Sequence, residues 1–343
     1  MTKSIHSPNP AIIEVTRGTL VESRHRVHAV VADAAGNIIH AWGDGDLEIY
    51  PRSAIKPLQT LALIETGAAD HWRLTDERIA LATASHSASA AHIMAVEAWL
   101  GDIGRGEGDL ECGAQMPTDE AAAHRLIKQD AAPTRLHNNC SGKHTGFLAT
   151  ALHMGEDLHG YTGADHPVQR RLYQALMEMG GADLSGTGRG VDGCGIPVYG
   201  MPLAALARAM AKMADPVTAG LGAVRTAAAQ RIVSSMAKHN FMVSGRDEDG
   251  GRGRACGGPA GPGIGRGGEG RGRRQARVGH VDGEFVEFPR RLRRGCPRRH
   301  GAVSGDGRGQ RRGQTRRRRA APGGLGPGLV RRVTPSYNRP CAV

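Results

Sequence analysis

Hydrophobic and polar positions follow a strand-like pattern near the start of this chain. Residues 11–18 and 25–33 are rich in apolar and β-branched side chains, and residues 33–37 supply turn formers before a further apolar run at 37–44. Runs of this kind, bounded by Gly, Asn and Asp, are typical of strands joined in a hairpin. We therefore expect the amino-terminal part to form a small sheet.

Further along the chain, apolar residues recur three or four positions apart, which is the period of an amphipathic helix. Ile55, Leu58 and Leu61 begin this pattern, and Gly67 is a suitable C-terminal stop. The other helices are predicted at residues 76–84, 91–100, 120–128, 167–179, 203–213 and 226–238. A hairpin followed by helices favours an α/β (α+β) domain of layered sheet and helices over a helix bundle.

Composition divides the chain into two unlike parts. Residues 246–343 contain 24 Arg, 24 Gly and no Lys, and their formal charge is +16. Because all 343 residues together carry +12, residues 1–245 carry −4. The sequence pI near 10 is therefore not a property of one basic globular protein. We expect a folded domain in residues 1–245 and a disordered Gly/Arg-rich tail in residues 246–343.

The tail has two interpretations. An arginine-glycine arm could bind RNA through phosphate contacts and base stacking, but the RGG unit occurs once, at residues 266–268, and aromatic residues are few. Alternatively, the tail comes from a GC-rich coding sequence that is translated in a shifted reading frame. Lysine disappears after Lys238, while the frequencies of Arg, Gly, Ala and Pro increase together. We favour the shifted frame and do not expect nucleic acid as a partner.

Neither a secretion signal nor a membrane span is expected. Residues 1–10 lack the apolar run of a signal peptide, and no stretch approaches the roughly 18 apolar residues that a span requires. We expect a cytoplasmic protein with no membrane partner. The six cysteines, at positions 112, 140, 194, 256, 296 and 341, are too widely spaced for a disulfide framework in such a protein, so they are packing residues or ligands.

Ser53 and Lys56 lie at helical spacing at the start of the first predicted helix, so their side chains would share a face. A lysine whose pKa is lowered by burial can act as the base that makes a serine nucleophilic. The same spacing also arises by chance, with a solvated lysine beside a capping serine. The cluster Ser85, His86 and Ser87 is likewise either a substrate-binding group or a helix cap.

Two glycine-flanked cysteines are candidates for a metal site. Cys140 lies in NNCSGKH and Cys194 in VDGCGIP, and two thiolates with a nearby nitrogen or carboxylate could bind zinc. Neither loop has the CxxC spacing of a structural zinc site, so buried free cysteines stay an alternative. Cys112 is a weaker third candidate.

Six segments, in order, have distinctive sequences: EVTRGTLVES from Glu14, PRSAIKPLQ from Pro51, ATASHS before Ala88, HNNCSGKHTGFL from His137, GVDGCGIP from Gly190 and HNFMVSG from His239. Together they resemble the rhizobial-type (class 3) L-asparaginase family, an asparaginase II-like group of amidohydrolases. The resemblance spans residues 11–245. It implies a fold like that of serine β-lactamases and glutaminases, and a homodimer.

The resemblance also implies hydrolysis of L-asparagine to L-aspartate and ammonia through an acyl-enzyme. It makes Ser53 the nucleophile, Lys56 its proton acceptor and Ser85 the serine of a second Ser-Lys tandem. It implies a zinc ion beside the substrate, with ligands Cys140, Lys143 and Cys194. The expected substrate-binding residues are Arg52, His144 and Asp192.

Two departures from the family pattern are visible. The lysine of the second tandem belongs to a KxGAEG-like segment, where this chain has GRGGEGRG at 265–272 and no lysine after Lys238. Gln115 stands where a histidine is more usual. We expect the altered C-terminus to impair activity. The alternatives are a β-lactamase or penicillin-binding-type serine acylase, for which KHTG at Lys143 only approaches the KTG motif, and an RNA-binding protein.

Sequencing the gene across the codons for residues 243–252 tests the shifted-frame hypothesis. We expect an intact alternative frame that encodes ordinary globular composition, lysine included. A gene without such a frame would refute the hypothesis.

Overall fold

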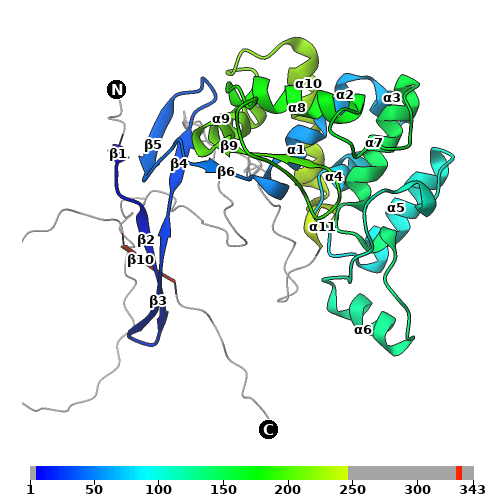
Figure 1. The fold of residues 1–343 in the computed structure, drawn as a ribbon, viewed down its shortest axis with the longest axis horizontal. Helices are drawn as coiled ribbons and strands as arrows, with labels where there is room; N and C mark the ends of the chain where they lie inside the picture. Colours follow the sequence, from blue (N-terminus) through cyan, green and yellow to red (C-terminus); the bar gives the residue numbers. More distant parts are fainter. Residues whose placement is uncertain (1–4, 246–329, 334–343) are drawn as a thin grey trace, which may run out of the picture.

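The computed structural model describes residues 5–245 and 330–333, which form one helical body with small sheets along one side (Figure 1). Ten strands are described: β1 (Ile5–Ser7), β2 (Ala11–Arg17), β3 (Leu20–Val27), β4 (Ala29–Ala32), β5 (Ile38–Trp42), β6 (Glu48–Ile49), β7 (Arg189–Val191), β8 (Pro197–Tyr199), β9 (Met201–Pro202) and β10 (Val330–Val333).

The α-helices in the described residues are α1 (Lys56–Gln59), α2 (Leu61–Glu65), α3 (Ala68–His71), α4 (Asp76–Ala82), α5 (Ala90–Asp102), α6 (Glu120–Lys128), α7 (Ser141–Met154), α8 (Pro167–Gly180), α9 (Leu203–Ala214), α10 (Ala223–Lys238) and α11 (Asn240–Ser244). Three short 3-10 helices are η1 (Arg52–Ile55), η2 (Glu107–Asp109) and η3 (Arg135–His137). The mixture of helices and sheets confirms the predicted α/β class.

The strands form four small sheets, with orders β1-β5-β4, β10-β2-β3, β6-β9 and β7-β8. The predicted turn at 33–37 is confirmed between β4 and β5, where Asn37 N donates to Asp33 Oδ1 at 2.8 Å and Gly36 has φ +88°. The single strand predicted at 25–33 is wrong, because the chain divides there between β3 and β4, which lie in different sheets. Figure 1 shows the β2–β3 hairpin projecting from the helical body.

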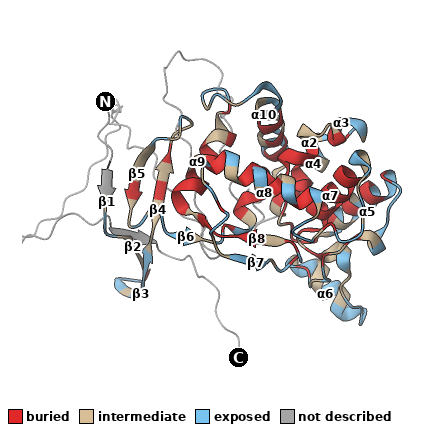
Figure 2. Cartoon of the chain, turned by 45° about the horizontal axis from the view of Figure 1, so that its top comes forward, coloured by how far each residue is buried: buried red, intermediate tan, exposed pale blue. Residues whose placement is uncertain are grey.

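The core lies among the helices (Figure 2). Predicted helices are confirmed, with small boundary shifts, in α4, α5, α6, α8, α9 and α10. The first predicted helix is divided into η1, α1 and α2 before Gly67, whose φ of +82° ends the segment. Helix α7 was not predicted, although residues 141–151 are all buried and the helix packs against α4, α3, α2 and α5.

A second apolar cluster joins the sheet to the helices. Val30 and Ala41 pack against the alanine-rich face of α9, formed by Ala204, Ala207 and Ala211. Small side chains let a helix approach a sheet closely, so the face of α9 fixes β4 beside the body. The antiparallel pair of β6 with β9 then fixes the chain that leads to η1.

The predicted disordered tail, residues 246–343, lies outside the described residues except for β10, which pairs with β2 in parallel. Within the described ranges, no helix is long and apolar enough to cross a membrane.

Replacing Gly142 with Ala tests the packing of α7 on α4. A Cβ atom there would lie 2.6 Å from the backbone oxygen of Leu81, so the helices must move apart. We expect the free energy of unfolding to fall by about 1–3 kcal/mol, the usual cost of overpacking a core, measured by urea denaturation. Gly101→Ala is the control, because a Cβ at this position of α5 meets nothing within 4 Å. Equal stability of the two variants would contradict the tight contact.

Candidate functional site

Ser53 lies in η1, the 3-10 turn that leads directly into α1 and Lys56. The residue before it, Arg52, has φ +47°, a left-handed conformation that is uncommon for a side chain with a Cβ. Such strain persists where the surrounding structure holds it, often at functional sites. Sequence analysis gave no sign of this strained turn.

A continuous hydrogen-bond chain joins Ser53, Ser85 and Lys56. The Nζ of Lys56 donates to the carbonyl oxygen of Ala84 and to Ser85 Oγ, each at 2.6 Å. Ser85 Oγ lies 2.9 Å from Ser53 Oγ. Lys56 therefore contacts Ser53 through Ser85, and one amine serves the first serine of both the SxxK and the SHS segments.

The side chain of Lys56 is only 1% exposed. Burial lowers its pKa from the ordinary value, because the charged ammonium loses its hydration, although the thiolate charge of Cys140 acts in the opposite direction. A lowered pKa raises the fraction of neutral amine, the form that accepts a proton.

The segment that carries Ser85 is held on both sides by backbone hydrogen bonds. Ser85 N donates to Val243 O of α11 at 2.9 Å, and His86 N donates to Asn139 O at 3.1 Å. Ala88, just beyond, has φ +58°. The loop is therefore fixed between α11 and the start of α7 rather than free at the end of α4.

Cys140, Lys143 and Cys194 form a buried cluster. Cys140 precedes α7, Lys143 lies in its first turn, and Lys143 Nζ is 3.2 Å from Cys194 Sγ. A hydrogen bond from the Cys194 thiol lowers the pKa of Cys140 well below its usual value, and the positive charges of Lys143 and Lys56 add to this effect against the opposing effect of burial. The hydrogen bond to Cys140 and burial raise the pKa of Cys194. Cys140 therefore favours the thiolate form, and Cys194 favours the thiol.

A tight turn between β7 and β8 presents Cys194. Gly195 N donates to Asp192 O, and Asp192 N donates to Ile196 O, each at 2.8 Å. Gly195 has φ +91°, which glycine adopts without strain. The glycines of VDGCGIP therefore turn the cysteine inward.

Arg52 and Asp192 form an ion pair at 2.9 Å, with side chains 62% and 14% exposed. Burial disfavours the charged form of Lys143, but the nearby charges of Cys140, Cys194 and Asp192 outweigh it and raise the pKa of Lys143. Asp192 therefore links the exposed guanidinium with the buried amine of Lys143, and the pair lies at the solvent side of the cluster.

His144 is fully buried, and its Nδ1 lies 2.7 Å from the hydroxyl of Tyr161. Sequence analysis missed Tyr161, which no motif marks. It also missed the support given by Asn138, whose Oδ1 accepts from Cys140 N at 2.9 Å and whose Nδ2 donates to Gly113 O at 2.7 Å. The repeated asparagines of HNNC were the available signal for this support.

Two residues flagged in the sequence lie beside this loop. Gln115 Oε1 accepts a hydrogen bond from Asn139 N at 3.3 Å, so the side-chain amide of Gln115 stabilises the turn that leads to Cys140. Burial raises the pKa of Cys112 to about 12, and its thiol lies 3.8 Å from Arg135 O. Cys112 therefore stays protonated as a packing thiol.

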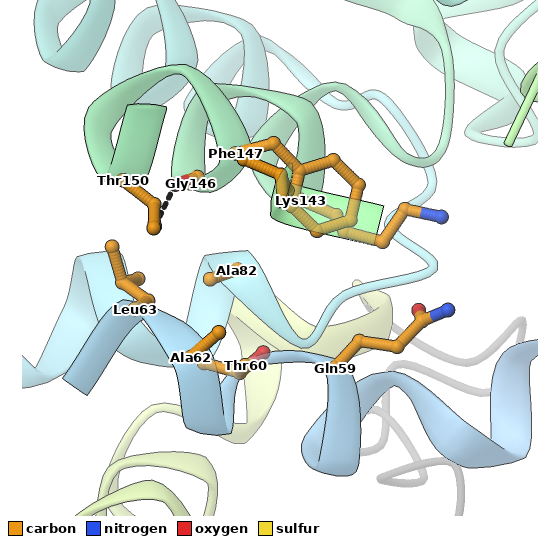
Figure 3. Close-up of a pocket in the computed structure, with 10 residues that line it drawn as sticks. Gln59, Thr60, Ala62, Leu63, Ala82, Lys143, Gly146, Phe147 and Thr150 are labelled. Carbon is orange, nitrogen blue, oxygen red and sulfur yellow. Dashed lines mark hydrogen bonds between the residues drawn. The ribbon is translucent and has the colours of Figure 1, made fainter. Parts of the chain in front are cut away.

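A small cavity lies between α1, α2, α4 and α7 (Figure 3), with a volume of about 10 Å³, of the order of one water molecule. Figure 3 shows the polar ends of Gln59 and Lys143 at the same end of it, and Phe147 beside them. The rest of the lining is mainly apolar, so the stem of Lys143 is enclosed while its amine faces Cys194.

No three His, Cys, Asp or Glu side chains gather to hold a metal ion in the part of the chain that the structure describes. A metal at the thiol cluster would therefore need the nitrogen of Lys143 as its third protein ligand. Two buried sulfur donors and an amine form a soft, water-excluding set, which suits zinc.

The L-asparaginase II family profile matches residues 13–251, which is more than half of the chain. Proteins of this class are amidohydrolases. The chain belongs to the L-asparaginase II family, which confirms the resemblance to an asparaginase II-like family. A search of curated proteins found no match to it.

Proposed function

We propose that this chain hydrolyses L-asparagine to L-aspartate and ammonia, with Ser53 as nucleophile, Lys56 as proton acceptor and Ser85 between them. The observation that supports this proposal is the chain of hydrogen bonds from Ser53 through Ser85 to the buried amine of Lys56. Family membership supports the choice of amide substrate.

The serine hydroxyls can each donate and accept, so the hydrogen-bond chain can run in either direction. With Lys56 neutral, Ser53 donates to Ser85 and Ser85 donates to Lys56 Nζ. Attack of Ser53 Oγ on the side-chain carbonyl then moves one proton from Ser53 to Ser85 and one from Ser85 to Lys56. Ser85 ends as a hydroxyl, and Lys56 ends as an ammonium.

Collapse of the tetrahedral adduct completes acyl transfer. The bond between carbonyl carbon and nitrogen breaks, Ser85 gives its proton to the departing nitrogen, which leaves as ammonia, and Ser85 takes the proton held on Lys56 in return. Water then adds to the ester on Ser53, again giving a proton to Lys56. The ester bond breaks, aspartate leaves, and the proton on Lys56 returns through Ser85 to Ser53, which is restored as a hydroxyl.

The outer residues have the charges that an amino acid substrate requires. Arg52 is an exposed guanidinium suited to an α-carboxylate, and Asp192 is a carboxylate suited to an α-ammonium group. In the free chain they bind each other. We propose that substrate replaces this ion pair, and that His144 lies at the inner end of the site.

Zinc is the cofactor that the donor set fits. Cys140, Lys143 and Cys194 would hold it, with Cys140 already favouring the thiolate that a zinc ligand requires. When bound, zinc supplies Lewis acidity or a template for a substrate oxygen. Lys143 would bind as the neutral amine and lose its proton on metal binding.

Three finer expectations belong to the same proposal. We propose a β-lactamase or glutaminase-like arrangement, a homodimer, and impaired activity caused by a C-terminus read in a shifted frame. The lysine that the family resemblance pairs with Ser85 has no counterpart after Lys238. In this chain Lys56 contacts Ser85 directly, which supports a single-amine mechanism.

Ser53→Ala tests the nucleophile in an ammonia-release assay with asparagine and glutamine. We expect the rate to fall below roughly 1% of the parent, since a missing nucleophile leaves only binding and electrostatic effects. Ser85→Ala should lose about 10²–10⁴-fold, the usual contribution of a proton-transfer group. Retention of more than a few per cent by Ser53→Ala would remove that serine as nucleophile.

The control for both serine variants is Ser185→Ala, because Ser185 is exposed and its hydroxyl bonds only the carboxylate of Asp183 among the described residues. All variants are measured in this chain and in a version that carries the alternative reading frame. Activity in the second version alone would place the impairment in the C-terminal third.

Metal analysis tests the proposed zinc ligands. We expect about one zinc per purified chain, and loss of the metal in a Cys140→Ser, Cys194→Ser double variant. Cys112→Ser is the matched control, because it also removes a buried thiol but should retain zinc. Zinc that persists in the double variant would refute the ligand assignment.

A further inference from the structure

Tyr161 is a buried residue whose hydroxyl joins the loop after α7 to His144. Its side chain is inaccessible to solvent, and its oxygen accepts a hydrogen bond from Glu111 N at 2.8 Å. The same oxygen lies 2.7 Å from His144 Nδ1. The two rings meet edge to face with centroids 5.5 Å apart, and Phe147 packs against both.

Glu111 fixes the position of this hydroxyl. Its carboxylate accepts hydrogen bonds from Gly160 N at 2.6 Å and from Thr162 Oγ1 at 2.7 Å, the residues on either side of Tyr161. The backbone N–H of Glu111 then donates to Tyr161 from the same residue. Glu111 therefore fixes the residues on both sides of Tyr161 through its carboxylate and the tyrosine oxygen through its backbone N–H.

The two hydrogen bonds of the Tyr161 oxygen determine which nitrogen of His144 carries the proton. Tyr161 already accepts from Glu111, and its single proton has Nδ1 of His144 as its hydrogen-bond acceptor among the described residues. If Nδ1 carried the proton instead, the tyrosine proton would lie buried without an acceptor, which is costly. The favoured form has a bare Nδ1 and a proton on Nε2.

The Nε2 atom of His144 is buried and has no hydrogen-bond partner in the described part of the chain. Buried donors are nearly always paired, so an unpaired one indicates a missing acceptor. The neighbouring amines are those of Lys143 and Lys56, and neither is its hydrogen-bond partner. An oxygen atom of a bound small molecule would satisfy the donor.

We propose that Tyr161 is a positioning residue that holds His144 in the Nε2–H tautomer, so that Nε2 donates to a carbonyl or carboxylate oxygen of the bound amide substrate. The identity of the substrate rests on the proposed function. The tautomer does not, because it follows from contacts of the free chain.

Nitrogen-15 NMR of the full chain labelled at histidine tests the tautomer directly. We expect His144 to show a protonated Nε2 and a bare Nδ1 in the parent, and mixed tautomers in Tyr161→Phe. Tyr173→Phe is the matched control, because the Tyr173 hydroxyl is also buried but has no hydrogen-bond partner among the described residues. This variant should leave the His144 signals unchanged.

His144→Gln identifies the His144 resonances among those of 16 histidines. If that variant does not fold, contacts from the imidazole to the Phe147 and Tyr161 rings identify them instead. A proton on Nδ1 in the parent would overturn the proposal, as would an unchanged tautomer in Tyr161→Phe. The tautomer of His144 in the parent is measured without any variant, so it tests the proposal even if Tyr161→Phe does not fold.

The activity arm separates this inference from the proposed function. We expect kcat/KM for asparagine to fall about tenfold in Tyr161→Phe and to stay unchanged in Tyr173→Phe, the loss expected from one misaligned hydrogen bond. A shifted tautomer with unchanged kcat/KM would refute the substrate contact. No hydrolysis by either the parent or the version that carries the alternative reading frame would refute the proposed function, while the NMR result would still decide the tautomer.

Discussion

The site depends on the burial of two lysine amines against a cysteine thiolate. Lys56 and Lys143 are both nearly inaccessible to solvent, and an unpaired charge in such a position costs several kcal/mol. Each amine has compensation: Lys56 has Ala84 O and Ser85 Oγ, and Lys143 has Cys194 and the thiolate of Cys140. The partners come from different segments, so forming the cluster fixes these segments relative to one another.

The surrounding structure holds these segments through backbone contacts that take no part in the proposed reaction. The backbone oxygens of Val243 and Asn139 accept hydrogen bonds from Ser85 N and His86 N. The absence of a Cβ at Gly142 lets α7 approach Leu81. Two of the four described non-glycine residues with positive φ, Arg52 and Ala88, lie in turns at the site, and the other two, Arg73 and Asp130, lie elsewhere. A rigid helical body with a few strained turns can present polar groups before substrate arrives, which is the condition for electrostatic preorganisation.

Local signals in the sequence were sufficient for helices that carry their own caps and an exposed face. Helix α6 begins after Asp119, whose side chain accepts from Ala122 N, and its predicted bounds agree with the structure. Helix α7 was missed because it is buried on every side and contains Gly142, Gly146 and Thr145, so neither periodicity nor helix propensity marks it. Tertiary packing, which the sequence pattern does not contain, stabilises it.

The candidate site divides in the same way. The spacing of Ser53 and Lys56 marked a shared face, but the contact between them passes through Ser85, which follows α4 and meets them only by folding. Tyr161 had no signal at all, because a tyrosine in a loop is unremarkable until Glu111 and His144 are beside it. Contacts between distant segments cannot be derived from local spacing.

A single amine that serves two hydroxyls constrains the proposed chemistry. In a pair of independent Ser-Lys tandems, each serine would have its own proton acceptor, and the two could act as acid and base together. Here Lys56 is bonded to Ser85 and reaches Ser53 only through it, so the amine can hold one proton at a time for both. The attacking and leaving steps must then use the amine in sequence. In the proposed mechanism Ser85 consequently relays each proton, and its hydroxyl is needed in both directions of transfer.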